Sequence, residues 1–148
     1  MLLARGLRCV AVLDVSGAAL HRARARVGDA AAAPTWIEAD VTADWSLQPV
    51  DIWHDRAVFH FLTSPDDRAQ YLAHLQRTLK VHGSAVVATF GPDGPERCSG
   101  LPVARYSPQT LATEFGEGFI LVDAVRYEHL TPRGRTQMFQ YSRLLRVF

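Results

Sequence analysis

The chain has 148 residues, enough for one domain with a single sizeable core, and its 48% hydrophobic and 21% charged content is ordinary for a globular protein. A net charge of +1 gives no electrostatic reason to expect nucleic acid or an anionic membrane as a partner, and no apolar run approaches transmembrane length. The two cysteines, Cys9 and Cys98, form neither a disulfide framework nor a CxxC motif, so we expect a cytoplasmic protein with reduced thiols.

The first part of the chain alternates strand and helix patterns. Residues 1–7 look like the end of a helix, and residues 9–13 are an almost wholly apolar run, as expected for a strand covered on both faces. Residues 16–27 predict a helix that starts at a serine cap and stops at Gly28. The sequence "TWIEAD" (35–40) predicts a further strand that ends in an acid.

The middle of the chain contains the clearest strand and helix signals. The sequence "DIWHDRAVFHFL" (51–62) predicts a strand. In the helix that follows, Ser64 is the expected cap, Pro65 occupies the first position and Asp67 completes a capping box. After a turn at "VHG", the sequence "SAVVATF" (84–90) predicts a buried strand.

The last third begins with a long loop and ends in a hairpin. The segment 91–106 is rich in glycine and proline and long enough for a functional loop. A short helix is expected from Ser107, and two extended runs, 119–130 and 136–148, are joined by the turn "TPRGR". Strands that alternate with helices predict a single α/β domain over residues 1–148, a doubly wound mixed sheet that is mostly parallel and closes with an antiparallel hairpin.

Several of these segments resemble class I S-adenosylmethionine-dependent methyltransferases of the bacterial small-molecule type. The resemblance lies in "VLDVSGAALHRAR", "IEADVT", the block from Asp51 to Phe90 and the C-terminal hairpin. The block is the most specific part, because it resembles the family's fourth strand with its "DR.v.H.l" ending, followed by helix and fifth strand. The turn before that strand reads "LKVHG", where the family has a sequence like "LKPGG". The resemblance covers nearly the whole chain and implies a Rossmann-like fold.

One part of the family pattern has no counterpart in this sequence. The family's first strand and its GxGxG loop, which holds the methionine end of the cofactor, are not found, and "MLLARGLR" resembles the end of the helix after that loop. Relative to the family, we therefore expect an N-terminally truncated chain. Because the family's first strand is central, its loss would leave strands with unpaired backbone groups. We expect a homodimer that covers the open sheet edge, and weak or absent cofactor binding by a single chain.

The resemblance implies that the cofactor is S-adenosylmethionine and that acids at the ends of two strands bind it. Asp14 lies where the family's acid accepts hydrogen bonds from both ribose hydroxyls, with Val15 beside it. A turn or helix-capping acid would look the same. Asp40 resembles the acid that takes the adenine amino group, with Val41 against the ring, and a strand-end turn is the alternative here.

The strand end around Asp55 carries the candidate catalytic residues. The resemblance implies that Asp55 contacts the cofactor or the acceptor, and either Asp55 or His60 could act as a general base for an acceptor that loses a proton. Arg56 could hold an anionic substrate. The structural alternatives are an internal ion pair that involves Arg56, and a core position for His60 between two phenylalanines.

The loop 91–106 lies where the family builds its acceptor pocket. It supplies the candidate substrate contacts Arg97, Cys98, Arg105 and Tyr106. A zinc site formed by His54, His60 and Cys98 would match no known ligand spacing, so we expect no metal.

The favoured function is methyl transfer from S-adenosylmethionine to a small-molecule acceptor, by an enzyme or by a truncated derivative of one. In such a reaction the protein mainly aligns the two reactants and excludes water. One alternative is a non-catalytic, dimeric Rossmann-like binding or scaffold protein, and a less supported one is a hydrolase that uses the region of Cys98 and His60. No GxSxG, Walker or HExxH motif occurs in the sequence.

Overall fold

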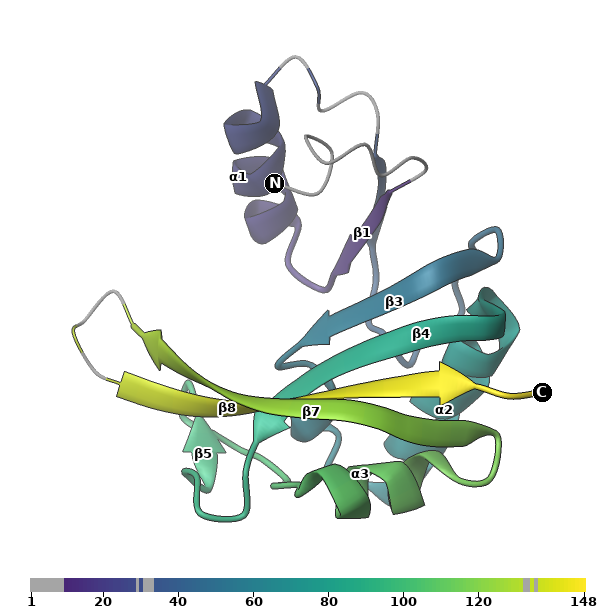
Figure 1. Ribbon diagram of the computed structural model, residues 1–148. Coiled ribbons are helices and arrows are strands. Elements are labelled where there is room, and N and C mark those ends of the chain that lie inside the picture. The colour runs from purple at the N-terminus through teal and green to yellow at the C-terminus, as the bar shows by residue number, and fades with distance from the viewer. Residues whose placement is uncertain (1–9, 29, 31–33, 132–133, 135) are drawn as a thin grey trace. The chain divides into compact units, whose positions relative to one another are not determined.

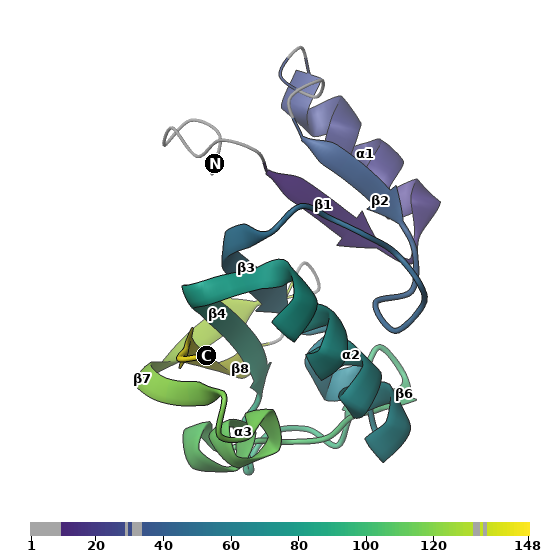
Figure 2. The same cartoon turned by 90° about the vertical axis from the view of Figure 1, so that its right-hand side faces the viewer.

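The structure of the protein is a computed structural model that describes residues 10–28, 30, 34–131, 134 and 136–148. The chain divides into two units, Met1–Trp45 and Ser46–Phe148, which Figures 1 and 2 show from two sides. The single domain expected over residues 1–148 stays a prediction. The helix end expected over residues 1–7 lies outside the described residues.

The described residues of the first unit form β1 (Ala11–Asp14), α1 (Gly17–Val27) and β2 (Thr35–Glu38). The two strands pair in parallel, with Asp14 opposite Glu38. The helix begins as predicted, because the Ser16 hydroxyl accepts a hydrogen bond of 3.2 Å from the Ala19 amide. It ends at Gly28, whose φ of +63° is a left-handed conformation that suits glycine.

The described residues of the second unit form β3 (Val50–Arg56), the 3-10 turn η3 (Phe59–Phe61), α2 (Pro65–Thr78), β4 (Leu79–Phe90), β5 (Arg97–Cys98), β6 (Leu101–Pro102), α3 (Pro108–Phe115), β7 (Phe119–Leu130) and β8 (Thr136–Arg146). Their main sheet has the strand order β3-β4-β8-β7. β3 and β4 are parallel, whereas β8 is antiparallel to both of its neighbours. Parallel pairs joined through helices and a closing antiparallel hairpin confirm the predicted α/β class.

Three local predictions were wrong. The turn expected at "VHG" (81–83) lies inside β4, which begins at Leu79 and not at residue 84. The strand expected over residues 51–62 ends at Arg56, because the Asp55 carboxylate accepts hydrogen bonds from the Val58 and Phe59 amides and turns the chain into η3. The capping box expected at the start of α2 is not formed there, since the Ser64 hydroxyl accepts from the second amide of the helix instead. A reciprocal capping box does form at the start of α3.

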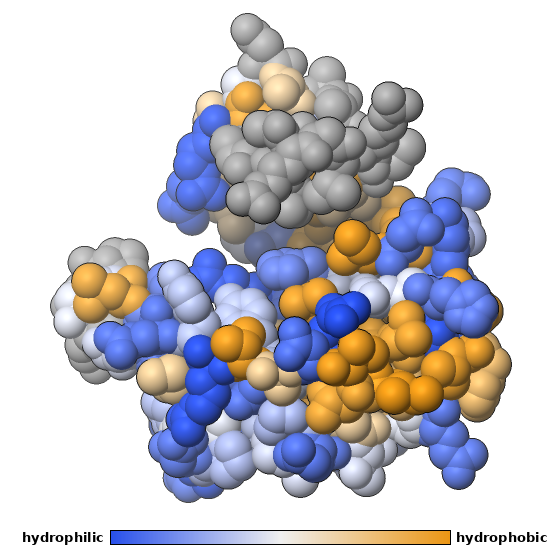
Figure 3. Space-filling model, viewed as in Figure 1, coloured by the Kyte–Doolittle hydropathy of each residue, from blue (hydrophilic) through white to orange (hydrophobic). Residues whose placement is uncertain are grey.

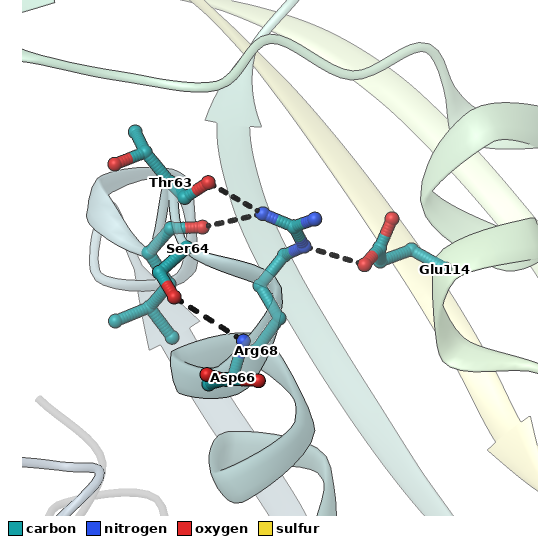
Figure 4. A network of polar contacts seen from close by, with 6 residues as sticks. Thr63, Ser64, Asp66, Arg68 and Glu114 are labelled. Carbon is teal, nitrogen blue, oxygen red and sulfur yellow. Dashed lines mark hydrogen bonds and ion pairs between the residues drawn. The ribbon is translucent and has the colours of Figure 1, made fainter.

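The core of the second unit lies between the main sheet and its two helices. The Phe59 ring packs against the rings of Tyr71 on α2 and Phe115 on α3, with ring centres 4.9 and 5.3 Å apart. Arg68 of α2 also ties the two helices, because its Nε donates at 2.5 Å to Oε1 of Glu114 on α3 (Figure 4). Both helices therefore cover the same face of the sheet.

The other face of the main sheet is open only in part: Ala88, Phe90 and Phe139 are buried on it, with Cys98 and Val103 packed against them. Side chains alternate along a strand, so Arg56 and Ile52 lie on the opposite face from Asp55. On that open face Ile52, Ile120 and Val125 are 54%, 54% and 59% exposed. Figure 3 shows apolar side chains gathered over the second unit, on the half of β7 and β8 nearest the C-terminus. Among the described helices, none is long and apolar enough to cross a membrane.

Candidate functional site

In the first unit, Asp14 and Asp40 lie at neighbouring strand ends. Asp14 ends β1, and its carbonyl accepts a hydrogen bond of 3.2 Å from the amide of Ala39, which precedes Asp40. The carboxyl edge of a parallel sheet is where this kind of fold places its ligands. The structure therefore brings the two predicted cofactor acids to one edge of the β1–β2 sheet.

Each carboxylate has one oxygen engaged in its own turn and one that accepts no hydrogen bond from the described residues. Oδ1 of Asp14 accepts from the Ser16 amide at 2.8 Å. Oδ1 of Asp40 accepts from the Thr42 amide at 2.8 Å and from its hydroxyl at 2.7 Å. Each acid can therefore stabilise its turn and also bind a ligand, because the remaining carboxylate oxygens can accept hydrogen bonds from a ligand.

Asp40 is held by hydrogen bonds from Thr42. The Thr42 amide and hydroxyl donate to its carboxylate and hold the pKa of Asp40 below its ordinary value. The valines that follow the two acids differ: Val15 is 70% exposed, whereas Val41 is buried. The carbonyl of Val41 accepts a hydrogen bond of 3.1 Å from the Trp45 indole, which fixes the chain after Asp40.

In the second unit, Asp55 is buried and its carboxylate is fully engaged within the protein. Oδ1 accepts from the Val58 amide at 2.9 Å, and Oδ2 accepts from the Phe59 amide at 3.0 Å and from the Tyr71 hydroxyl at 2.7 Å. Burial raises the pKa of Asp55, and these hydrogen bonds oppose that shift. Asp55 thus stabilises the end of β3, and both of its carboxylate oxygens accept hydrogen bonds from the protein.

His60 is fully buried between aromatic rings. Its ring centre lies 4.6 Å from that of Phe61 and 5.0 Å from that of Phe90. Neither ring nitrogen has a hydrogen-bond partner in the described part of the chain, and burial lowers the pKa of His60 to about 4. A general base needs contact with the proton it removes. The geometry supports the interpretation of His60 as a core residue. Its ring nitrogens form no hydrogen bond with the Cys98 thiol.

Arg56 lies on the open face of the main sheet. Its Nη2 is 3.1 Å from Nδ1 of His129, and its guanidinium lies over the Phe139 ring at 6.0 Å from the ring centre. The internal ion pair considered from the sequence is not formed, because Asp55 faces Tyr71 on the opposite face. Arg56 therefore remains a candidate substrate contact.

Two of the candidate substrate contacts in the loop 91–106 bind the loop itself. Arg97 donates to the Gly100 carbonyl from Nε and Nη2, which closes the hairpin of β5 and β6. Arg105 donates to the Gly94 carbonyl at 3.1 Å and pairs with Glu96 at 3.2 Å. Both guanidinium groups are thus used to order the loop, a role that was not predicted from the sequence.

The other two loop candidates are embedded to different degrees. Tyr106 is buried against Phe59, with ring centres 5.5 Å apart, and burial raises its pKa. Cys98 is a free thiol at intermediate exposure that packs against the cluster of Ala88, Phe90 and Phe139. No group of three or more acids, histidines and cysteines among the described residues could hold a metal ion.

Sequence reasoning missed two residues at this site. Tyr71 donates to Asp55 from sixteen positions along the chain, and His129 reaches Arg56 across a separation of 73 residues. A histidine in an exposed strand pattern carries no local signal of such a contact. Tyr71 could have been noticed, since it is an aromatic residue on the apolar side of a predicted helix.

A family model and several solved structures connect this chain with methyltransferases. The sequence profile of the family described as methyltransferase domain matches residues 1–87. The N-methyltransferase NodS from Bradyrhizobium japonicum WM9 has a similar structure, with a TM-score of 0.72 and 15% identity over 95% of this chain and 74% of that one. A NodS structure in complex with S-adenosyl-L-homocysteine gives a TM-score of 0.71 and 17% identity over 93% of this chain and 66% of that one.

A third similar structure is the 1,6-didemethyltoxoflavin-N1-methyltransferase of Burkholderia thailandensis, with bound 1,6-didemethyltoxoflavin and S-adenosylhomocysteine. Its TM-score is 0.73 at 20% identity, over 99% of this chain and 64% of that one. At these identities the likeness shows the fold, and it confirms the Rossmann-like prediction. No curated protein matches the sequence.

Proposed function

This chain belongs to the methyltransferase domain family, and on that premise we propose that it transfers a methyl group from S-adenosylmethionine to a small-molecule acceptor. The bound cofactor would supply an electrophilic methyl group, while the protein aligns the acceptor and excludes water. The observation that carries the proposal is the pair Asp14 and Asp40 at one sheet edge, each with a carboxylate oxygen that no described group occupies.

The two acids fit the donor groups of an adenosyl cofactor. A carboxylate oxygen accepts hydrogen bonds and offers no proton that would oppose a ribose hydroxyl or an amino group. The resemblance to the family assigns Asp14 to the ribose hydroxyls, and the Ser16 amide holds its carboxylate in place through Oδ1. The resemblance likewise assigns Asp40 to the adenine amino group, and hydrogen bonds from Thr42 lower the pKa of its carboxyl.

The proposed reaction needs no general base from Asp55 or His60. Methyl transfer to a nucleophile that carries a free electron pair is a direct displacement, so alignment is the main contribution of the protein. Asp55 contributes by holding the end of β3, and His60 by filling the core beside Phe90. The hydrolase alternative loses its support, because it requires a base in hydrogen-bond contact with the Cys98 thiol.

Calorimetric titration with S-adenosylhomocysteine tests the proposal. We expect binding in the micromolar range, which Asp14→Asn weakens about tenfold because an amide keeps the turn but loses the charge and one acceptor. Asp44→Asn, an exposed acid of the same unit, is the matched control and should bind like the unaltered protein. Affinity that is millimolar or absent in the unaltered chain would contradict the enzyme and favour the scaffold alternative.

We also propose that the protein is a cytoplasmic homodimer. Among the described strands β3 pairs only with β4, so one edge of the main sheet is open beside the exposed side chain of Ile52. Open edges next to apolar side chains favour self-association. The free thiol of Cys98 suits a reducing compartment. Light scattering at micromolar concentration should give twice the chain mass, and a stable monomer would contradict the dimer.

A further inference from the structure

On the partly open face of the main sheet Arg56 contacts His129 and Phe139, and further aromatic rings lie next to Phe139. We call this group of side chains the Arg56 corner and define it by Arg56, Phe90, His129, Phe139 and Tyr141. Arg56 lies opposite Ala88, and Ala88 lies opposite Tyr141, so the three share a face. The Phe139 ring lies 5.0 Å from that of Phe90 and 6.2 Å from that of His129. The whole corner belongs to the second unit.

Within the part of the chain that the structure describes, no acid forms an ion pair with Arg56. The ion pairs between described residues use other cations, namely Arg68, Lys80, Arg105 and Arg126. Arg56 is exposed, and one of its five N–H donors goes to His129. The remaining donors of the guanidinium form a planar fork whose shape matches a carboxylate or phosphate group.

The direction of this fork is fixed from two sides. For Arg56 to donate to it, Nδ1 of His129 must be unprotonated, and the contact then holds one edge of the guanidinium at 3.1 Å. The guanidinium carbon also lies over the Phe139 ring, 6.0 Å from the ring centre. A cation that is oriented before binding loses less conformational freedom when it binds an anion. His129 is therefore a positioning residue that acts through Arg56.

The surroundings of the fork are apolar and aromatic. Ala57, Cys98, Val103 and Tyr141 pack against the cluster of Ala88, Phe90 and Phe139. Tyr127 is 58% exposed and contacts the Tyr141 ring at 6.3 Å. Phe90 and Phe139 are themselves buried, so the aromatic surfaces that a ligand beside Arg56 can reach are the exposed ring of Tyr127 and the half-buried ring of Tyr141. Such surfaces beside one cation suit a ligand that is itself a ring with an acidic group.

We propose that the methyl acceptor is an aromatic oxyanion, a ring that bears a carboxylate or a phosphate, and that Arg56 binds its oxygens. That this ligand is the methyl acceptor rests on the proposed methyl transfer. The binding site itself rests on the second unit alone, whereas the cofactor acids belong to the first. Loss of S-adenosylhomocysteine binding would therefore leave the anion site standing, and loss of the anion site would leave the methyl-transfer proposal standing.

The test is an NMR titration of the full chain, without cofactor, with benzoate, phenyl phosphate and the neutral isostere benzamide. We expect the better oxyanion to bind at least about tenfold more tightly than benzamide, with a shift of the Arg56 Nε–Hε resonance. The tighter of the two oxyanions identifies the acidic group. Equal affinity for both oxyanions and benzamide would overturn the proposal.

Three variants test separately how the charge of Arg56, the shape of its guanidinium group and its position contribute to oxyanion binding. Arg56→Ala should abolish the preference for the oxyanion, and Arg56→Lys should reduce it, because an ammonium keeps the charge without the fork. Arg143→Ala removes another exposed arginine of the same sheet face and should keep the preference. A preference that survives Arg56→Ala would overturn the assignment.

The role of His129 has its own variant. His129→Leu should weaken oxyanion binding several-fold, leave benzamide affinity unchanged and move the Arg56 Nε–Hε resonance in the free protein. Circular dichroism at the same protein concentration checks that each variant is folded. Unchanged oxyanion affinity in His129→Leu would show that His129 does not position Arg56.

Discussion

The Tyr71 hydroxyl donates a hydrogen bond of 2.7 Å to Oδ2 of Asp55, while it accepts one of 2.8 Å from the Trp53 indole. This contact joins α2 to the end of β3 in the core of the second unit. It holds Asp55 on the helix-covered face, so the next residue, Arg56, emerges on the open face. A buried structural contact thus decides where the candidate substrate-binding cation lies.

Removal of the Tyr71 hydroxyl should destabilise the second unit. Tyr71→Phe leaves buried Asp55 with one donor fewer and takes an acceptor from Trp53, so we expect the free energy of unfolding to fall by about 1–3 kcal/mol. Urea unfolding followed by tryptophan fluorescence measures the change. Tyr127→Phe removes a hydroxyl from an exposed tyrosine and should change stability by less than about 0.5 kcal/mol. Equal effects of the two variants would contradict the role of the contact.

His60 should make stability depend on pH. Burial lowers its pKa from 6.5 to about 4, so between these values the unfolded chain binds a proton that the folded chain does not. The contribution of His60 to the free energy of unfolding is therefore complete above pH 6.5 and is lost as the pH falls toward 4. His60→Leu should remove this dependence, as seen in urea midpoints between pH 4 and 7.

The control for this pH experiment is a substitution of an exposed histidine. His82→Asn changes such a residue at a left-handed position that asparagine tolerates, so its pH profile should follow that of the unaltered protein. A His60→Leu profile parallel to the unaltered one would show that His60 binds no proton on unfolding.

Gly83 in β4 has no room for a side chain. A Cβ there would lie 2.8 Å from both the Leu79 side chain and the Lys80 carbonyl, and a backbone atom cannot easily move away. Gly83→Ala should lower the free energy of unfolding by about 1–3 kcal/mol. Thermal unfolding measures the change. At Gly118 the nearest atoms are 3.9 and 4.0 Å away, so Gly118→Ala should have little effect on the free energy of unfolding. A stable Gly83→Ala variant would show that the β4 backbone yields.

The contact between Arg68 and Glu114 should stabilise the packing of α2 on α3. Arg68 also donates to the carbonyls of Leu62 and Thr63, so its guanidinium is already held in place (Figure 4). The two side chains are 17% and 32% exposed. A double-mutant cycle with Arg68→Ala and Glu114→Ala should give a coupling energy of about 1 kcal/mol.

The exposed pair of Lys80 and Asp51 provides the reference for that cycle. Its side chains are 49% and 79% exposed, so water screens the attraction and the coupling should be no more than about 0.5 kcal/mol. A coupling between Arg68 and Glu114 as small as this reference would mean that α3 packs on α2 through apolar contacts alone.

Local signals predicted the elements well where the responsible contacts are local. The caps at Ser16 and Ser107 bond to amides three residues away, and Gly28 ends α1 within the same turn. The strand expected over residues 51–62 was too long, because its end depends on Asp55, whose two amide contacts are visible only when the chain has turned. Apolar residues after Arg56 looked like a strand, although they fill the core from a 3-10 turn.

By itself, the sequence determined the α/β class, the closing hairpin and the two acids at the ends of β1 and β2, because strand periodicity and turn chemistry act over a few residues. Only the tertiary structure decided which polar side chains are used internally. It placed Asp55 against Tyr71, left the ring nitrogens of His60 without a hydrogen-bond partner among the described residues and set Arg56 beside His129, 73 residues away. Such contacts depend on the face that each strand presents after packing, and a difference of one residue reverses that face.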